Sequence, residues 1–511
     1  MLCSLFVVAT RQDIQGQIAA LLGDVKRDID VSRARRIFCN RNLKMASIEV
    51  IGFDMDYTLA LYQQDRLEQL SIELTLRKLI ENHGYSDEIL GLSYDSRLAI
   101  RGVVIDRGAG NVFKMDRHGH VGRVFHGLTL LSKDERNQEY RRLRIRLSSP
   151  RYAWIDTLFG LPEAVMYMTL VAHFDRVKQR GGADVPTYGE LFDDIRASID
   201  EAHRDDTLKT VIKAEMPSYV AKDPRLGETL HKLRSSGKKL FLLTNSLYDY
   251  SNAVMSYLLD GERKAYPSWR NYFDAVIVGA AKPAFFTDKN PFLLVDPITG
   301  KTGTTPVKAL HRDKVYQGGN IFDFEEMSNV RGDRVLYVGD HIYGDMIRLK
   351  KVHTWRTAMV VQELDGENRT SERLGGQISD LDLLDRRRRN LESEIDYQVT
   401  MLKQLQRVMD DSEPALHAEL EGVVRQAKHA LDSLRGRARM IEDEVIALES
   451  SIDQSYNPHW GAIFREGSEN SRFGSQVAQY ADLYTSRVSN FLSYSPLRYF
   501  RAARQQMPHE L

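Results

Sequence analysis

Four apolar runs along the chain each end in polar residues, and this pattern predicts the centre of the fold. The runs cover residues 47–53, 238–244, 274–279 and 334–340. Each run is short and apolar at successive positions, which is typical of strands that are buried on both faces of a parallel sheet. Open α/β sheets bind their ligands at the carboxyl ends of such strands. We therefore expect an α/β fold with a Rossmann-like parallel sheet, and we expect chemistry where these runs end.

The first run ends in two carboxylates, Asp54 and Asp56, which are separated by one methionine. A carboxylate at a strand end can attack phosphorus as a nucleophile. Its neighbour two residues further on can protonate the leaving oxygen and later deprotonate water. An acidic pair alone is a weak signal, because solvated loop charges have the same pattern. The assignment therefore depends on the other three runs.

The three later runs supply the other groups that this chemistry needs. Thr244 ends the second run, where its hydroxyl and backbone N–H can hold a phosphoryl oxygen. Lys282 follows the third run and offers a cation that neutralises phosphate charge as the transition state forms. Asp340 and Asp345 accompany the fourth run and add two carboxylates. Four strand ends that carry these groups in order favour a catalytic site over a chance grouping of surface charges.

Paired carboxylates repel a phosphate dianion, so the predicted site needs a divalent cation. We predict Mg²⁺, a hard cation that takes a few protein oxygens together with the substrate phosphate. The predicted ligands are Asp54, the backbone carbonyl of Asp56, Asp340, and Asp345 either directly or through water. In the predicted mechanism Asp54 forms an aspartyl-phosphate, and Asp56 protonates the departing alkoxide and then activates water. The threonine and lysine of the second and third runs clamp the phosphoryl group throughout.

The four motifs and their order resemble those of the haloacid dehalogenase superfamily of phosphatases. The stretches between the motifs are similar, nearly from end to end, to the cytosolic purine 5′-nucleotidases. The matching segments include residues 101–106, 156–163, 339–346, 480–484, 500–503 and 507–510. The resemblance implies a fold of the haloacid dehalogenase type with an inserted cap. It also implies Mg²⁺-dependent hydrolysis of nucleoside 5′-monophosphates, with IMP and GMP preferred.

The resemblance further implies a substrate-binding set at matching positions. The residues of this set are Phe159, Arg196, Asp200, His203, Lys209 and Asn245. Phe159 would stack on the base. Two departures from the family pattern concern the base: Gly160 stands where better-known members carry Asn, and Arg204 stands where they carry an aromatic residue. Losing an amide relaxes discrimination between bases by on the order of 1–3 kcal/mol, so these departures weaken the expected purine preference.

Nearly two hundred residues separate the first two runs, which indicates a large insertion. We expect an N-terminal arm over 1–47, a catalytic core over 48–62 and 236–375, an inserted cap over 63–235, and a helical hairpin with a C-terminal tail over 376–511. The insertion mixes helical periodicity with hairpin signals, and such a cap selects the leaving group and excludes water. Residues 357–363 are expected to form the last strand of the sheet.

Two charged helices are expected in the hairpin region. Apolar residues recur every three or four positions from Leu384 to Met409 and again from Val424 to Ile452. This spacing predicts an antiparallel, coiled-coil-like helical hairpin. In the resembled family this region contributes to oligomers, and some members bind nucleotide effectors away from the active site. The resemblance therefore implies a homo-oligomer, dimer or tetramer, and a nucleotide effector.

Composition fits a large cytoplasmic enzyme with no nucleic-acid or membrane partner. Lys plus Arg and Asp plus Glu number 71 each, so no basic excess calls for nucleic acid. The two cysteines, Cys3 and Cys39, give no disulfide framework, which suits a reducing compartment. The apolar start over residues 1–9 has no basic residue before it and is too short to span a bilayer, so we expect an arm rather than an export signal.

Three alternatives accompany these expectations. His118, His120 and His126 suggest a metal cluster, but the residues around them favour a hairpin turn. The enzyme could be a phosphatase of the same superfamily that acts on another phosphomonoester. It could also be a non-catalytic nucleotide-sensing scaffold whose helical hairpin is the working surface, although the intact Asp54 and Lys282 argue against this.

Overall fold

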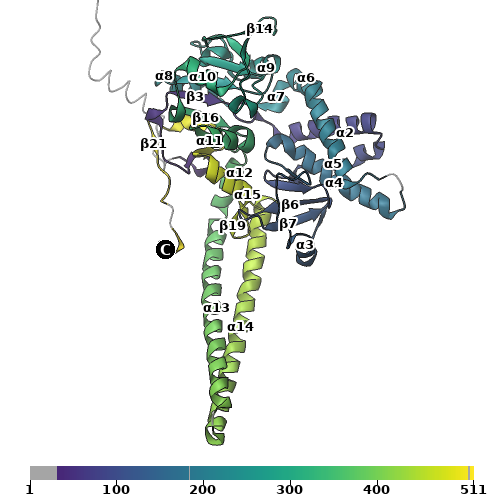
Figure 1. Cartoon of the computed structure of the whole chain (residues 1–511), viewed down its shortest axis with the longest axis vertical. Coiled ribbons are helices and arrows are strands. Elements are labelled where there is room, and N and C mark those ends of the chain that lie inside the picture. Colours follow the sequence, from purple (N-terminus) through teal and green to yellow (C-terminus); the bar gives the residue numbers. More distant parts are fainter. Residues whose placement is uncertain (1–30, 183–184, 412, 505–506, 511) are drawn as a thin grey trace, which may run out of the picture. The chain divides into compact units, whose positions relative to one another are not determined.

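The computed structural model describes residues 31–182, 185–411, 413–504 and 507–510, and Figure 1 shows the arrangement of the elements. The chain divides into two compact units. The first unit extends to Gly366 and resumes at Ile463, and the second unit spans Glu367–Ala462. The apolar start of the chain, including Cys3, lies outside the described residues.

A ten-stranded sheet forms the centre of the first unit. Its strands, in spatial order, are β1 (Phe38–Cys39), β20 (Leu483–Thr485), β17 (Arg356–Val360), β16 (Val335–Gly339), β3 (Val50–Phe53), β11 (Lys239–Leu243), β12 (Ala275–Val278), β15 (Val315–Gly318), β13 (Phe292–Val295) and β14 (Thr302–Pro306). The strands from β20 to β15 are parallel, and β1, β13 and β14 are antiparallel. The four apolar runs form β3, β11, β12 and β16, so the prediction of an α/β fold with a parallel sheet is confirmed.

Strand β3 lies between β16 and β11, and all four of its residues are buried. Gly52 of this strand is required by packing, because a Cβ there would lie 2.1 Å from Cζ of Phe241 on β11. The Phe241 ring packs against Phe324 with centroids 4.5 Å apart and against Trp355 at 6.0 Å. These aromatic contacts belong to a hydrophobic cluster under the sheet. They fix the strand whose end carries Asp54.

The expectation that residues 357–363 form the last strand of the sheet is wrong. Strand β17 pairs in parallel with β20 from the C-terminal tail, and β20 pairs with β1 from the N-terminal arm. The tail therefore belongs to the unit with the sheet and not to the hairpin with which it was grouped. Strand β20 has three residues, and its partners lie far away in the sequence, so local periodicity could not reveal the pairing.

The insertion between β3 and β11 contains both helices and hairpins, as the sequence predicts. Its larger helices are α2 (Gln64–His83), α4 (Leu161–Gln179) and α5 (Tyr188–Arg204). A five-stranded antiparallel sheet accompanies them, in the order β8 (Thr129–Leu130), β7 (Val121–His126), β6 (Asn111–Met115), β5 (Val103–Asp106) and β9 (Tyr152–Trp154). Helix α5 begins with a capping box in which Thr187 and Glu190 satisfy each other's backbone N–H groups.

The histidines of the insertion form a turn and a strand rather than a metal cluster. Asp116 Oδ1 accepts the backbone N–H groups of His118 and His120 at 2.7 and 2.9 Å, which closes the turn between β6 and β7. His126 lies in β7, where its ring nitrogens contact Asn111 and Asp175. Across the described parts of the chain, no group of three or more potential metal ligands includes these histidines. The predicted hairpin turn is confirmed.

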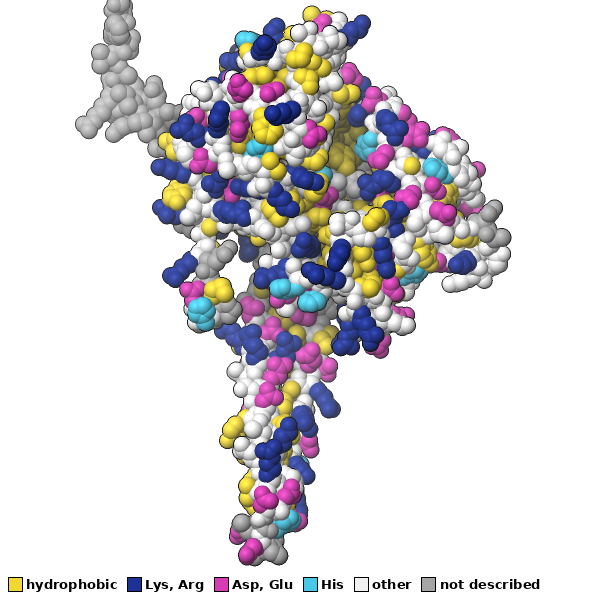
Figure 2. Space-filling model, in the orientation of Figure 1, with side chains coloured by type: hydrophobic (Ala, Val, Ile, Leu, Met, Phe, Trp, Pro, Cys, Tyr) yellow, Lys and Arg dark blue, Asp and Glu magenta, His cyan; other side chains and the backbone are white. Residues whose placement is uncertain are grey.

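The second unit contains the predicted helical hairpin, formed by α13 (Gly375–Asp410) and α14 (Pro414–Tyr456). Its predicted apolar seam is buried at Leu391, Met409, Leu431 and Val445, among others. Acidic and basic side chains are interspersed along the face of the hairpin seen in Figure 2. In the described residues, no helix has the length and apolar character needed to cross a membrane.

Candidate active site

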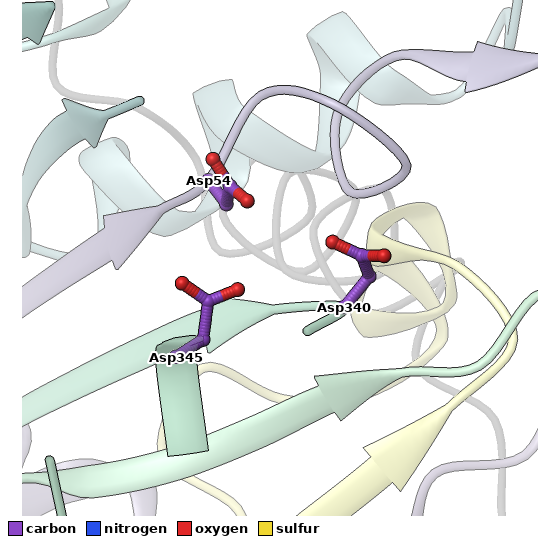
Figure 3. Close-up of side chains that lie close together, drawn as sticks. All are labelled: Asp54, Asp340 and Asp345. Atoms are coloured by element: carbon purple, nitrogen blue, oxygen red, sulfur yellow. The ribbon is translucent and has the colours of Figure 1, made fainter. Parts of the chain in front are cut away.

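Three carboxylates converge beyond the ends of adjacent strands. Asp54 follows β3, Asp340 follows β16, and Asp345 lies in the helical turn η10 (Ile342–Ile347). One oxygen from each lies within 4.8 Å of the others, and Figure 3 shows the three side chains directed toward one another. All three are buried. A Cβ at Gly339 would lie 2.4 Å from Asp345 Oδ2, so glycine is needed for this approach.

Lys282 lies between two of these carboxylates. Its Nζ is 2.9 Å from Asp54 Oδ1 and 2.8 Å from Asp345 Oδ1, and it donates to the Tyr337 hydroxyl at 2.9 Å. The lysine side chain is 5% exposed. Burial lowers the pKa of Lys282, but the two carboxylates outweigh burial and raise this pKa well above its ordinary value. Lys282 therefore remains a cation in the site.

Three buried carboxylates and one lysine leave an excess of negative charge. Burial raises the pKa of Asp340 to about 7, although the Arg101 guanidinium opposes the increase. Asp340 Oδ2 is buried and has no hydrogen-bond partner among the described residues. A hard divalent cation prefers oxygen ligands of this kind and would satisfy both the charge and the unpaired oxygen. The residues of this triad therefore fit such a cation.

Asp56 is held by two hydroxyl groups. Tyr62 donates to its Oδ1 at 2.6 Å, and Ser246 donates to its Oδ2 at 2.8 Å. The Tyr62 hydroxyl is also 2.9 Å from the hydroxyl of Tyr250. Burial raises the pKa of Asp56, and the hydrogen bonds from Tyr62 and Ser246 oppose this increase. The carboxyl group is thus fixed in orientation without a direct cationic partner among these contacts.

A cavity of about 330 Å³ joins the acidic groups to residues of the insertion. It is lined by Asp54, Asp56, Tyr62, Thr157, Phe159, His203, Leu208, Lys209, Ile212, Asn245, Ser246, Tyr250, Lys282, Asp340, His341, Gly344 and Asp345. The volume lies within the range of small-molecule sites. The sequence predicts both the acidic residues of this cavity and several of the residues that the insertion contributes to it.

The insertion contributes Phe159 and His203 to the cavity lining, and we call this part of the lining the aromatic end. The Phe159 ring lies 4.6 Å from Tyr57 and 5.9 Å from His203, measured between centroids, in edge-to-face geometry. Burial lowers the pKa of His203, and the positive charge of Lys209 lowers it further. The imidazole is therefore neutral at pH 7. The side chain of Asn245 donates to the Lys282 carbonyl at 3.0 Å and accepts from the Lys282 N–H. Asn245 therefore contacts the backbone of Lys282.

Three predicted site residues lie outside the cavity lining. Thr244 is fully buried, and its Oγ1 accepts the Ser246 N–H at 3.1 Å. Arg196 makes a bidentate pair with the buried Glu163 at 2.9 and 2.6 Å, and Asp200 is exposed on the same helix. Their roles with substrate stay predictions. Of the two departures from the family pattern, Arg204 is exposed and Gly160 is the N-cap residue of helix α4. Both also lie outside the lining.

Sequence reasoning missed the hydroxyl groups around Asp56. Ser246 follows Thr244 by two residues, so its place after a strand end could have been noticed. Tyr62 and Tyr250 are separated by 188 residues and carry no local signal of their meeting. His341 was also missed, although it follows Asp340 directly. Its Nε2 is 3.2 Å from Asp156 Oδ1, which lies in the insertion.

The strand ends of this parallel sheet bring three carboxylates and a lysine together in a cavity. This arrangement suits enzymes that act on phosphorylated substrates. The profile of the 5′ nucleotidase family matches residues 37–511, so the chain belongs to this family. The cytosolic purine 5′-nucleotidases belong to the same family, so the predicted membership is confirmed. The chain is accordingly a 5′-nucleotidase, an enzyme that hydrolyses nucleotide phosphomonoesters.

Three individual proteins are similar to parts of this chain. A 5′-nucleotidase domain-containing protein from Dictyostelium discoideum is 29% identical over 482 residues, which cover 93% of this chain and 74% of that protein. A predicted phosphoglycolate phosphatase from Haemophilus somnus is 13% identical, covers 62% of this chain and 87% of its own, and has a TM-score of 0.28. A 2-haloacid dehalogenase from Pseudomonas syringae is 14% identical, covers 61% and 86%, and scores 0.20. Because both scores are low, the fold rests on the strand order described above.

Proposed function

We propose that the enzyme hydrolyses nucleoside 5′-monophosphates through a phosphorylated Asp54, with Mg²⁺ as cofactor and IMP and GMP as preferred substrates. One observation carries the proposal: a single cavity is lined both by Asp54 beside Lys282 and by Phe159 beside His203. A nucleotide has the same two parts, a phosphate that needs charge compensation and a base that stacks on aromatic rings.

Asp54 is the proposed nucleophile. Its Oδ1 accepts the N–H of Met55 at 2.8 Å and lies 2.9 Å from Lys282 Nζ, so the carboxylate is held in a fixed orientation. An Asp54 oxygen attacks phosphorus while the bond between phosphorus and the nucleoside 5′-oxygen breaks. Asp56 gives its proton to that departing oxygen, and the nucleoside leaves. Lys282 balances the negative charge of the phosphoryl group.

Asp56 then takes the second role in the proposed cycle. It removes a proton from water, whose oxygen attacks the phosphorus of the aspartyl-phosphate, and the bond to Asp54 breaks. Inorganic phosphate leaves, and both aspartates return to their starting states. The hydrogen bonds from Tyr62 and Ser246 support this assignment, because a general acid and base must keep its orientation through both steps.

The cation has a proposed place beside these groups. Asp54, Asp340, Asp345 and the backbone carbonyl of Asp56 would hold Mg²⁺, as the acidic triad and the unpaired Asp340 oxygen favour. When bound, the ion would supply charge neutralisation for the phosphoryl oxygens. In the same proposal, Thr244 acts on the phosphoryl group from the end of β11.

Base recognition is assigned to the residues of the insertion. Phe159 and His203 line the aromatic end, and Lys209 reaches the same cavity. Arg196 and Asp200, one helical turn apart on α5, complete the proposed set. Gly160 brings no side-chain amide to the base, so we expect the preference for IMP and GMP to be modest.

A phosphate-release assay tests the proposal. Purified enzyme is given purine monophosphates, pyrimidine monophosphates and sugar phosphates, each with Mg²⁺ and with chelator. We expect release from IMP and GMP that depends on Mg²⁺. Release mainly from sugar phosphates would replace the nucleotide assignment with another phosphomonoester. No phosphate release from any substrate would favour a non-catalytic scaffold.

The proposal also includes a cellular setting that follows from the family resemblance. We propose a cytoplasmic homo-oligomer, dimer or tetramer, that responds to a nucleotide effector and uses the helical hairpin for assembly. Light scattering of the full chain, compared with a chain in which the hairpin apex is shortened, measures the subunit number. A monomer in both cases would reject the assembly role of the hairpin.

A further inference from the structure

Arg101 is a charged side chain with no solvent exposure, and it lies beside the acidic triad. It precedes β5 in the insertion. Its Nη1 donates to the backbone carbonyl of Asp340 at 2.9 Å. Its Nε and Nη2 donate to the two carboxylate oxygens of Glu363 at 2.8 and 2.6 Å. The guanidinium carbon also lies 5.1 Å from the ring centroid of Phe473, which belongs to the C-terminal tail.

These contacts connect the insertion to the segment that carries two of the three triad carboxylates. The Asp340 carbonyl belongs to the peptide that leads into His341, so fixing this carbonyl restricts rotation about the Asp340 backbone. His341 makes a second contact with the insertion, since its Nε2 is 3.2 Å from Asp156 Oδ1. The segment from Asp340 to His341 is thus held from the insertion at two points.

The pairing with Glu363 determines how Arg101 affects the triad. An unpaired guanidinium at this place would repel a cation, but the bidentate pair with Glu363 neutralises most of its charge. Besides opposing the rise in the pKa of Asp340, Arg101 then acts on the triad through geometry. When a group that hydrogen-bonds to a metal-ligating residue and fixes its orientation is altered, the metal affinity of the site typically changes.

We propose that Arg101 is a positioning residue for Asp340, and that the insertion sets the cation affinity of the triad through it. The inference rests on the proposed cation site and adds to it a residue that touches neither substrate nor ion. Lysine cannot replace this arginine, because its point charge cannot satisfy Glu363 in a bidentate manner and donate to the Asp340 carbonyl at the same time.

The test compares Arg101→Lys and Arg101→Met with a matched control, Lys114→Met. Lys114 is also a buried cation of the insertion, 1% exposed, and it joins the C-terminal tail through the Arg465 carbonyl and Glu466. It does not line the active-site cavity. Each full-length variant is titrated with Mn²⁺ in the absence of substrate, free Mn²⁺ is measured by electron paramagnetic resonance, and the melting temperature is recorded.

We expect Mn²⁺ to bind wild type and Lys114→Met equally, and to bind both Arg101 variants about 10- to 100-fold more weakly. All three variants should melt at lower temperatures than wild type. Equal Mn²⁺ affinity in Arg101→Lys and wild type would overturn the inference and leave the proposed function intact. An equal loss in Arg101→Lys and Lys114→Met would also overturn it, because Arg101 would then act only through stability.

Two further results complete the design. If wild type does not bind Mn²⁺, both the proposed cation site and the inference fail. If Arg101→Met does not fold, Arg101→Lys and Lys114→Met carry the test, because Arg101→Lys keeps the positive charge beside Glu363. The inference then requires weaker Mn²⁺ binding in Arg101→Lys than in Lys114→Met, and equal binding in the two variants would overturn it.

Discussion

The two ends of the active-site cavity are built on different principles. At the acidic end, Asp54, Asp340 and Lys282 each follow a strand of one parallel sheet, and their side chains are almost completely buried. At the aromatic end, Phe159 and His203 come from helical segments of the insertion and are only partly buried. The proposed chemistry thus depends on strand order, whereas the proposed recognition depends on how the helical segments of the insertion are packed.

This difference explains how well each end could be predicted. Residues that end adjacent parallel strands must meet at one edge, so the sequence order of apolar runs predicts the acidic end. Helix surfaces have no such constraint. Arg196 and Asp200 lie on the predicted helix but outside the cavity lining, and Arg196 is bound to Glu163.

The largest expected effect comes from the acidic end. Asp54→Asn preserves the size of the side chain but removes the charge of the proposed nucleophile. We expect kcat to fall by about 10⁴-fold or more, because no covalent intermediate can form. Phosphate release from IMP, followed at saturating substrate, measures the change.

Folding is the control for this prediction. The variant should keep its melting temperature or raise it, since burial raises the pKa of Asp54 and so disfavours its charge in the folded state. Activity near wild type, with a chain that remains folded, would show that another group attacks phosphorus.

The acidic end also shows where sequence reasoning stops. The four core strands and their terminal residues could be predicted, because the information lies within each run. Strand β20 and the hydroxyl of Tyr250 could not be predicted, since they meet β17 and Tyr62 from distant parts of the chain. Pairing across long separations is decided by tertiary packing, which a single sequence does not display.

The next effect concerns stability at the aromatic end. Glu68 on α2 is 3% exposed, and its Oε2 is buried without a hydrogen-bond partner in the described residues. Burial raises its pKa from 4.5 to about 7. Because the folded pKa exceeds the unfolded one, the folded state holds the proton more tightly, and this group lowers stability as pH rises from 4.5 to 7.

Glu68→Gln should therefore stabilise the protein above neutral pH. We expect a gain on the order of 3 kcal/mol at pH 8, and most of the gain should disappear near pH 4.5. Urea denaturation at both pH values measures it. Glu73→Gln, on the exposed face of the same helix, is the matched control and should change stability by about 0.5 kcal/mol or less. An equal gain at both pH values would contradict the assigned cause.

Phe159 tests recognition directly. Its ring lines the cavity and packs edge-to-face on Tyr57. Removing the ring by Phe159→Ala takes away base stacking, which is worth roughly 1–3 kcal/mol. We expect KM for IMP to rise about 30-fold, while release from a small phosphomonoester such as p-nitrophenyl phosphate stays near wild type. An equal loss of kcat/KM on both substrates would mean that Phe159 contributes to the chemistry of the acidic end. The contrast between the two ends would then disappear.

The smallest predicted effect lies where the two ends meet, at Tyr62. Its hydroxyl donates to Asp56 at 2.6 Å, and its ring lies 6.1 Å from the Phe159 ring in edge-to-face geometry. Tyr62→Phe keeps the ring and removes only the hydrogen bond to the carboxyl group. We expect kcat to fall about tenfold, because a hydrogen bond to a charged group contributes roughly 1.5 kcal/mol or more, and we expect KM for IMP to stay the same.

Tyr250→Phe is the matched control for Tyr62. The Tyr250 hydroxyl contacts that of Tyr62 and, among the described residues, makes no hydrogen bond to Asp56. Its loss should therefore change kcat less than the loss of the Tyr62 hydroxyl. Steady-state kinetics on IMP separates the two variants. A rise in KM with unchanged kcat in Tyr62→Phe would mean that this hydroxyl serves recognition. A fall in kcat alone places this hydroxyl with Asp56, so Tyr62 of strand β4 (Leu61–Tyr62) would belong to the chemistry even though its ring contacts Phe159.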